Sequence, residues 1–211
     1  MKLGFLQLGW VLFLATLGAG AVLGFQAPAE KTGVADINRM METSDFGKSI
    51  KDQLDKMRAA REDVLGFIDT NRVLTTEQAM TLRDLSLKPT ITKEEQAELD
   101  SLKAAVIATN KKWAELATKP NMTPEERTLV QDYADRAQKM DRLGSQWVTT
   151  FTRDIDSWVE KEKAESNRRA RAAIQTVAKA QSYTMVYDSV FTPYGVNDIT
   201  DAALDAMNAQ K

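Results

Sequence analysis

The stretch from Glu125 to Ser182 contains no proline, and apolar side chains return along it at nearly every helical turn. Their spacing is close to the 3.6 residues of an α-helical turn, so one helix is expected to continue to about residue 181. Such a helix would be about 85 Å long, more than the width of a compact domain of this size. We therefore expect a helix that coils against partners or projects as an arm. Because its repeat exceeds 3.5 residues, a simple left-handed two-stranded coil is not expected.

Three segments in the middle of the chain repeat one local pattern, an aliphatic residue or methionine followed by Thr-x-x-Gln/Glu. The threonine and the acid or amide three residues later form a capping box, in which each side chain accepts a free backbone N–H at the start of a helix. Helices are therefore expected to begin at about residues 76, 93 and 124, the first two covering about 76–87 and 93–117. The segments are 74–78, 91–95 and 122–126, and Lys-Pro pairs stand at 88–89 and 119–120.

The segment after residue 43 predicts one more helix. Apolar residues recur at helical steps from Phe46 to Ile68, with Ser44 or Thr43 as the N-cap, which favours a helix from about Ser44 to Asn71. Together with the capped helices and the long helix, it makes the region 44–182 almost entirely helical.

Residues typical of β-strands lie near the two ends of the chain. Val34–Asn38 follows a glycine, and Tyr183–Asp188 is rich in aromatic and branched residues and ends before a Pro-Tyr-Gly turn. A short strand at 196–199 is expected to follow, after which Thr200 is expected to cap a last helix at 201–208. The fold class is therefore mainly α with a small β body (α+β), in which the two ends meet in one sheet and a long helical hairpin lies between them.

The N-terminus carries a targeting signal. Lys2 precedes an almost unbroken apolar run from Leu3 to Phe25, and small residues at Ala19 and Ala21 form an Ala-x-Ala cleavage site. Residues 1–24 are therefore expected to be a signal peptide, followed by a polar linker at 25–33. The run is also long enough to span a bilayer, so an uncleaved membrane anchor is the alternative. Both interpretations place the rest of the chain outside the inner membrane.

The composition argues against several classes of function. The chain has no His and no Cys, which leaves no imidazole base, no thiolate nucleophile and no usual zinc, haem or iron–sulfur site. No phosphate-binding glycine motif or Gly-x-Ser-x-Gly motif occurs. The formal net charge of -2 gives no general attraction to nucleic acid. We expect no catalytic residue, metal site or cofactor and no nucleic-acid partner, with membrane contact possible only through an uncleaved N-terminus.

Several local motifs resemble the Skp/OmpH family of periplasmic chaperones. Asp36–Ser44, continuing into Gly47-Lys48, is similar to the family's opening strand-to-helix segment. Ile174–Lys179 leads into Tyr183–Asp188 like the family's return helix and strand, and Asp198-Ile199-Thr200 resembles its C-terminal element. The resemblance covers about 34–75 and 160–211. The chain departs from the pattern in being slightly acidic and in carrying the extra capped helices between about 75 and 122.

The resemblance implies a periplasmic, ATP-independent holdase that assembles as a homotrimer. A β body formed by residues 34–43 and 183–211 would mediate oligomerisation, and the helical arms at 44–182 would enclose a cavity. The cavity would hold unfolded outer-membrane or other exported proteins. The residues expected in the oligomerisation body are Val34, Ile37, Met185, Val186, Tyr187 and Ile199.

Four large side chains on the long helix are the candidates for client contact: Met140, Trp147, Phe151 and Trp158. Exposed methionine and aromatic side chains can bind many unfolded sequences, because they offer apolar area without fixed geometry. The alternative is that they pack against the neighbouring helix, as amphipathic stripes usually do. Two other functions also remain open: a membrane-anchored periplasmic spacer, and an adaptor whose capped helices bind one dedicated partner.

Overall fold

The computed structural model describes residues 30–192, 194, 195 and 197–210. The chain is mainly α-helical with a small two-stranded sheet, as predicted. It divides into two compact units: unit 1 comprises residues up to Met40 and from Arg169 onward, and unit 2 comprises Met41–Arg168. The predicted signal peptide at 1–24 and residues 25–29 of the predicted linker lie outside the described residues.

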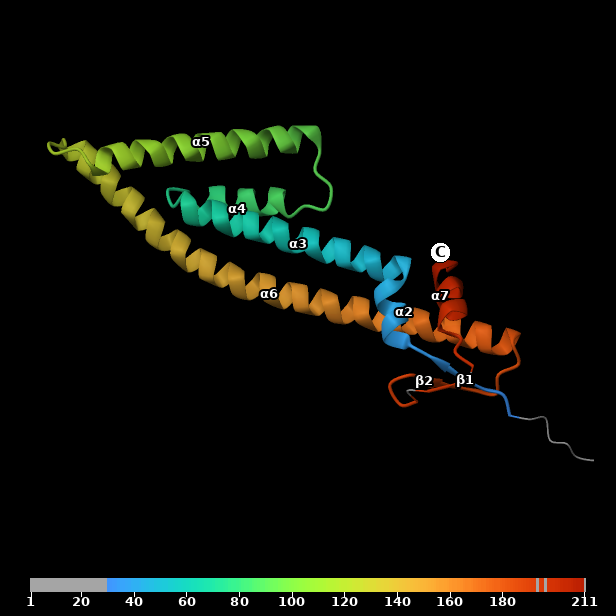
Figure 1. The fold of residues 1–211 in the computed structure, drawn as a ribbon. Helices are drawn as coiled ribbons and strands as arrows, with labels where there is room; N and C mark the ends of the chain where they lie inside the picture. The colour runs from blue at the N-terminus through green and yellow to red at the C-terminus, as the bar shows by residue number, and fades with distance from the viewer. Residues whose placement is uncertain (1–29, 193, 196, 211) are drawn as a thin grey trace, which may run out of the picture. The chain divides into compact units, whose positions relative to one another are not determined.

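Unit 2 is built from four helices that alternate in direction along the chain (Figure 1). Short turns at 71–75, 87–92 and 118–123 connect them, so consecutive helices run in opposite directions, and α4 packs against both α3 and α5. The helices are α3 (Asp45–Thr70), α4 (Thr76–Ser86), α5 (Lys93–Ala117) and α6 (Pro124–Ala180), the last of which continues into unit 1.

The helices begin where the capping boxes predict. Thr75 and Thr92 each accept the N–H of the residue three positions on, and that residue's side chain accepts the cap N–H in return. Thr123 and Glu126 form the same pair of bonds at the start of α6, at 2.9 and 3.2 Å. The α3 helix is capped by the Ser44 hydroxyl. Side chains of the first turn thus satisfy backbone N–H groups that the helix itself leaves free.

The repeated Lys-Pro pairs have a structural role that the sequence did not reveal. Each lysine bonds the capping-box glutamate seven residues later: Lys88 bonds Glu95, and Lys119 Nζ lies 2.6 Å from Glu126 Oε1. These lysine hydrogen bonds are the main reason that the pKa values of both glutamates lie below the usual value. The same turn chemistry therefore starts both α5 and α6.

One apolar core runs through unit 2. All four helices and the turn between α3 and α4 contribute to it, so the capped helices at 76–86 and 93–117 are packed elements of the unit. The buried residues are Val64, Ile68, Val73, Leu74, Ala79, Leu82, Leu99, Val106, Tyr133, Met140, Leu143, Trp147 and Phe151.

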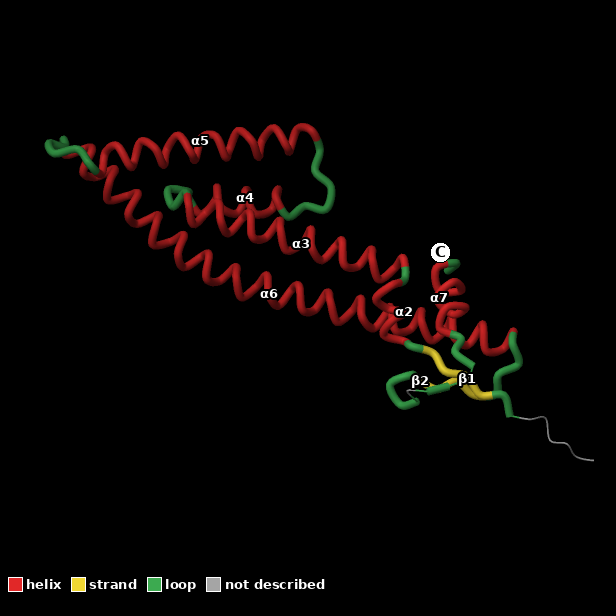
Figure 2. Tube along the Cα trace, in the orientation of Figure 1, coloured by secondary structure: helices red, strands yellow, loops and turns green. Residues whose placement is uncertain are grey.

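Unit 1 contains the sheet. Strand β1 (Thr32–Ala35) pairs in parallel with β2 (Met185–Asp188), so the two ends of the chain do meet in one sheet, as predicted (Figure 2). On its other edge β1 bonds to the segment before α7 (Thr200–Asn208), through Val34 N–H to Asn197 O and Ile199 N–H to Val34 O. The outer edge of β2 has no strand beside it among the described residues.

Three predicted boundaries near the sheet were wrong. β1 begins at Thr32, inside the predicted linker, and ends at Ala35 because Asp36 starts a short helix, α2 (Ile37–Thr43). The Asp36 carboxylate accepts the Arg39 N–H at 2.9 Å. Ile37 is therefore helical and half-buried rather than part of a strand. β2 begins at Met185 instead of residue 183.

The segment before α7 also differs from the prediction. It contributes one bridge, Asp198 to Val34, instead of a strand at 196–199, and residue 196 lies outside the described residues. Thr200 is the first residue of α7 rather than its cap. Its backbone N–H and its hydroxyl both donate to the Asp198 carboxylate, at 2.8 and 2.5 Å, and its hydroxyl oxygen accepts the Asp36 N–H at 2.9 Å. This network joins the end of β1 to the start of α7.

Candidate functional site

Three of the four residues predicted to contact clients are buried in the core of unit 2. Met140, Trp147 and Phe151 are each at most 6 % exposed, so the packing alternative describes them in the single chain. Arg83 lies over the Trp147 ring and Arg61 over the Phe151 ring, at 5.4 and 5.5 Å. Cations from α3 and α4 thus cover aromatic side chains of α6.

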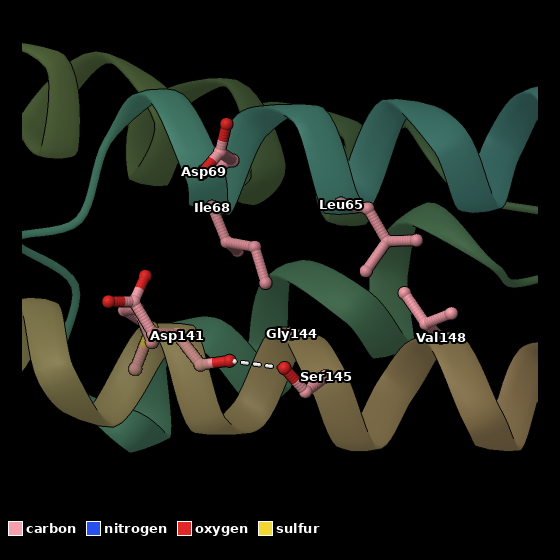
Figure 3. Close-up of a pocket in the computed structure, with 8 residues that line it drawn as sticks. Leu65, Ile68, Asp69, Asp141, Gly144, Ser145 and Val148 are labelled. Atoms are coloured by element: carbon pink, nitrogen blue, oxygen red, sulfur yellow. Dashed lines mark hydrogen bonds between the residues drawn. The ribbon is translucent and has the colours of Figure 1, made fainter.

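Two apolar hollows lie along α3 where it packs on α6. The first, of about 340 Å³, is lined by Leu65, Ile68, Met140, Gly144 and Val148, with Asp69, Asp141 and Ser145 at its polar margin. Figure 3 shows Leu65 and Val148 pointing toward one another across the hollow. Gly144 adds no side chain to the floor of the hollow, where a methyl group would be in ordinary van der Waals contact with the Ile68 side chain, at 3.5 Å. Val148 remains 51 % exposed, which makes the hollow accessible.

The second hollow is larger, about 500 Å³, and lies nearer the start of α3. Lys51 and Lys163 stand at its margin opposite the single acidic residue Glu42, and the Ser166 hydroxyl lies buried in its wall. Its lining is mostly apolar, as in most ligand pockets. The remaining lining residues are Met41, Gly47, Ile50, Leu54 and Val159.

The two hollows lie on one face of the α3–α6 pair. Gly47, Leu54 and Leu65 on α3 are separated by seven and eleven residues, which is close to two and three full helical turns. Val148 and Val159 on α6 are also eleven residues apart, about 16 Å along the helix. An apolar, partly exposed face with two hollows therefore follows α3 along its contact with α6.

One end of the first hollow is held by an ion-pair network. Arg72 pairs with Asp69 at 2.5 Å and with Asp141 at 3.1 Å, which links the end of α3 to α6. The hydrogen bond from Arg72 to Asp69 and the charge of Asp141 raise the pKa of the guanidinium. These groups are largely exposed, so the network positions the two helices more than it stabilises them.

A second apolar surface lies in unit 1. Large apolar side chains of β2 and of the segment after it are exposed, with Phe191 and Tyr194 each 84 % exposed. Of the residues predicted in the oligomerisation body, Met185 and Tyr187 belong to this surface, whereas Val34 and Ile199 are buried and Val186 is half-buried. We call Met185, Tyr187, Val190, Phe191 and Tyr194 the β2 patch.

A comparison with known families identifies the chain. A family model described as Outer membrane protein (OmpH-like) matches residues 31–207. The chain belongs to the OmpH-like family. This family consists of periplasmic chaperones of the Skp type rather than enzymes. Searches of the curated proteins and of the solved structures gave no match.

Over residues 30–210, leaving aside 193 and 196, no group of three or more acidic side chains is placed to hold a metal ion. In the same described residues, no helix is long and apolar enough to cross a membrane.

Sequence reasoning missed most residues that give this OmpH-like chain its accessible apolar surfaces. Val148 is the exposed neighbour of the buried Trp147, and Val190, Phe191 and Tyr194 follow β2 where a turn was expected. A signal for the last three was present, since three large apolar residues in five positions are unusual for a solvated turn. No sequence signal distinguished Val148 from the stripe beside it.

Proposed function

We propose that this protein is an ATP-independent holdase that binds unfolded outer-membrane and other exported proteins in the periplasm. The observation that carries the proposal is the apolar α3–α6 face, with its two hollows, in a member of the OmpH-like family. Each hollow can take an apolar side chain of an unfolded client, and neither is enclosed enough to require one sequence. Binding lowers the concentration of free unfolded chain by mass action and needs no nucleotide.

The proposal extends to the assembly and the location of the protein. Residues 1–24 direct export and are cleaved. Unit 1 holds the copies of a homotrimer together, because the β2 patch and the outer edge of β2 offer apolar area and free backbone groups to another copy. The helical region 44–182 then carries the client-binding face of each copy.

The holdase activity is tested by diluting a urea-unfolded outer-membrane β-barrel protein into buffer that contains the mature chain, and following light scattering. We expect suppression of aggregation at roughly one trimer per client. Val148→Asp places a charge at the mouth of the first hollow and should raise the concentration for half-maximal protection about three- to fivefold, as expected for losing part of a valine contact. Gln146→Asp, at an exposed position on the same helix, is the matched control.

Two outcomes would count against the holdase. Scattering that stays unchanged at several-fold excess of the wild-type chain removes the function itself. Equal protection by Val148→Asp and Gln146→Asp means that the first hollow takes no part in client binding. Intact mass of the protein from cells tests the export step, since a mature start between residues 21 and 25 is expected and a retained Met1 contradicts cleavage.

A further inference from the structure

A third pocket of unit 2 differs from the two hollows in its charge. It measures about 510 Å³ and lies between α3, the turn after α4, and α6. Its apolar wall includes Trp158, the one residue of the four predicted client contacts that remains partly exposed. The other lining residues are Gln53, Lys56, Met57, Ala60, Arg61, Ser86, Leu87, Lys88 and Pro89.

The pocket is cationic. None of the described residues that line it is acidic, and three of them, Lys56, Arg61 and Lys88, are basic. Lys88 is neutralised by its ion pair with Glu95, which leaves Lys56 and Arg61 as the basic lining residues without an acidic partner in the described part of the chain. Lys56 is exposed, and Arg61 is held in place by its position over the Phe151 ring and by its bond from Nη1 to the Met57 carbonyl at 3.1 Å.

Two polar groups in the wall of the pocket lack a hydrogen bond. Arg61 Nε and the Ser86 hydroxyl are buried atoms with no partner in the described part of the chain. An unpaired buried donor costs free energy, which a ligand recovers if it supplies an acceptor after a small turn of the side chain. Arg61 has five donors in a planar fork, the geometry that matches a carboxylate.

We propose that this pocket binds carboxylate side chains that lie beside apolar residues in an unfolded client. The carboxylate pairs with Arg61 and Lys56 and accepts a hydrogen bond from the Ser86 hydroxyl. The adjoining apolar side chain packs on Trp158 and Leu87. The proposal rests on the holdase function, and it adds that the chain prefers acidic–apolar client segments to neutral ones. The two hollows described above are not expected to share this preference, because acidic residues line both of them, Asp69 and Asp141 in the first and Glu42 in the second.

The test is the binding of labelled peptides to the mature chain, followed by fluorescence anisotropy. An alternating Leu-Glu hexapeptide should bind about tenfold more tightly than the Leu-Gln peptide, the difference expected for a charge-assisted hydrogen bond. The difference should shrink as salt is added. Lys56→Glu alters an exposed residue, so folding is retained, and it should abolish the preference for Leu-Glu and improve binding of a Leu-Lys peptide.

Lys111→Glu, at an exposed position on α5, makes the same charge change away from the pocket and should leave the preference intact. The indole N–H signal of Trp158 should shift during titration with the Leu-Glu peptide, while that of Trp113 stays constant. Equal affinities for Leu-Glu and Leu-Gln, or equal effects of Lys56→Glu and Lys111→Glu, contradict the proposed carboxylate preference of the pocket. The holdase function is unaffected by either result if the wild type still protects the unfolded barrel protein from aggregation. Loss of that protection in the wild type overturns both.

Discussion

Unit 2 encloses large apolar side chains from four helices, aromatic ones among them, whereas the described part of unit 1 buries no aromatic side chain and leaves Tyr187, Phe191 and Tyr194 in solvent. The core of unit 2 includes leucine, isoleucine, methionine, tyrosine, tryptophan and phenylalanine. Four of the buried apolar residues of unit 1 are alanines, at 35, 170, 173 and 203. A two-stranded sheet is at best marginally stable in water without a further strand or a packed face. The helical unit therefore completes its own core, and the sheet unit does not.

The difference fits the different tasks that we propose for the two units. A unit that is stable alone can expose a partly apolar face to clients and keep its fold. A unit with an open strand edge and exposed aromatic residues gains stability from another copy, because association removes that surface from water. This contrast would be wrong if the stability of unit 2 depended on assembly, or if unit 1 were stable without another copy.

The largest effect is expected in the core of unit 2. Leu82 on α4 has no exposed surface, and Leu82→Ala should lower the free energy of unfolding by about 2–5 kcal/mol because it leaves a cavity. Tryptophan fluorescence in urea measures this, since Trp113, Trp147 and Trp158 all lie in unit 2. The loss should be the same at all protein concentrations. Ile107→Ala, at a 53 % exposed position, is the control and should cost far less; a concentration-dependent loss would show that unit 2 is not self-sufficient.

The next effect concerns assembly through unit 1. Phe191→Asp puts a charge in the β2 patch and should weaken association at least about thirtyfold, as for a central interface residue. Mass from light scattering over a dilution series measures it, with the exposed Gln181→Asp as a control of equal charge. The urea unfolding of unit 2 should be almost unchanged in both variants. If Phe191→Asp has the same mass as the wild type at every dilution, the patch does not join the copies.

The helices could be predicted from the sequence because their signals are local. Each capping box lies within five residues, and the long apolar stripe without proline needs no knowledge of its partners. The start of α2 could not be found in this way. Val34 to Ile37 is too short for its period to separate strand from helix, and Asp36 is followed three positions later by Arg39 instead of a glutamate that would complete the box.

The candidate site was less predictable because exposure depends on distant residues. Trp147 and Trp158 occupy similar positions in the stripe, yet Trp147 is buried with Arg83 of α4 over its ring, whereas Trp158 lies only at the end of α4 and stays partly exposed. The contact of Arg83 with Trp147 depends on the turn at 71–75, which folds α4 back along α3. The burial of a stripe residue therefore depends on the packing of the capped helices α4 and α5. Their existence was predictable from the sequence, but their packing was not.

Two glycines on α3, Gly47 near the start of unit 2 and Gly66 further along the helix, should respond oppositely to substitution by alanine. A methyl group at Gly47 would lie 1.8 Å from the Met41 carbonyl oxygen, so Gly47→Ala should cost about 1–3 kcal/mol by forcing this turn apart. Gly66 has open space around it, and Gly66→Ala should stabilise the helix by up to about 1 kcal/mol. Thermal unfolding of the two variants measures the contrast, and a shift of the same sign in both would remove the special role of Gly47.

The smallest expected effect is a pH dependence confined to unit 1. The hydroxyl and backbone N–H of Thr200, with Arg39 nearby, lower the pKa of the Asp198 carboxyl below its usual value. A carboxyl with a lowered folded pKa stabilises the fold above its unfolded pKa of about 3.9, and this contribution is lost as pH falls through the folded value. Asp198→Asn should therefore lower the melting temperature slightly at pH 7, and the difference should close at an acidic pH below the folded pKa. Since the carboxyl is largely solvated, screening keeps the effect small. Calorimetry of both proteins at the two pH values measures it, and a difference that persists in acid would mean that the charge of Asp198 does not hold β1 to α7.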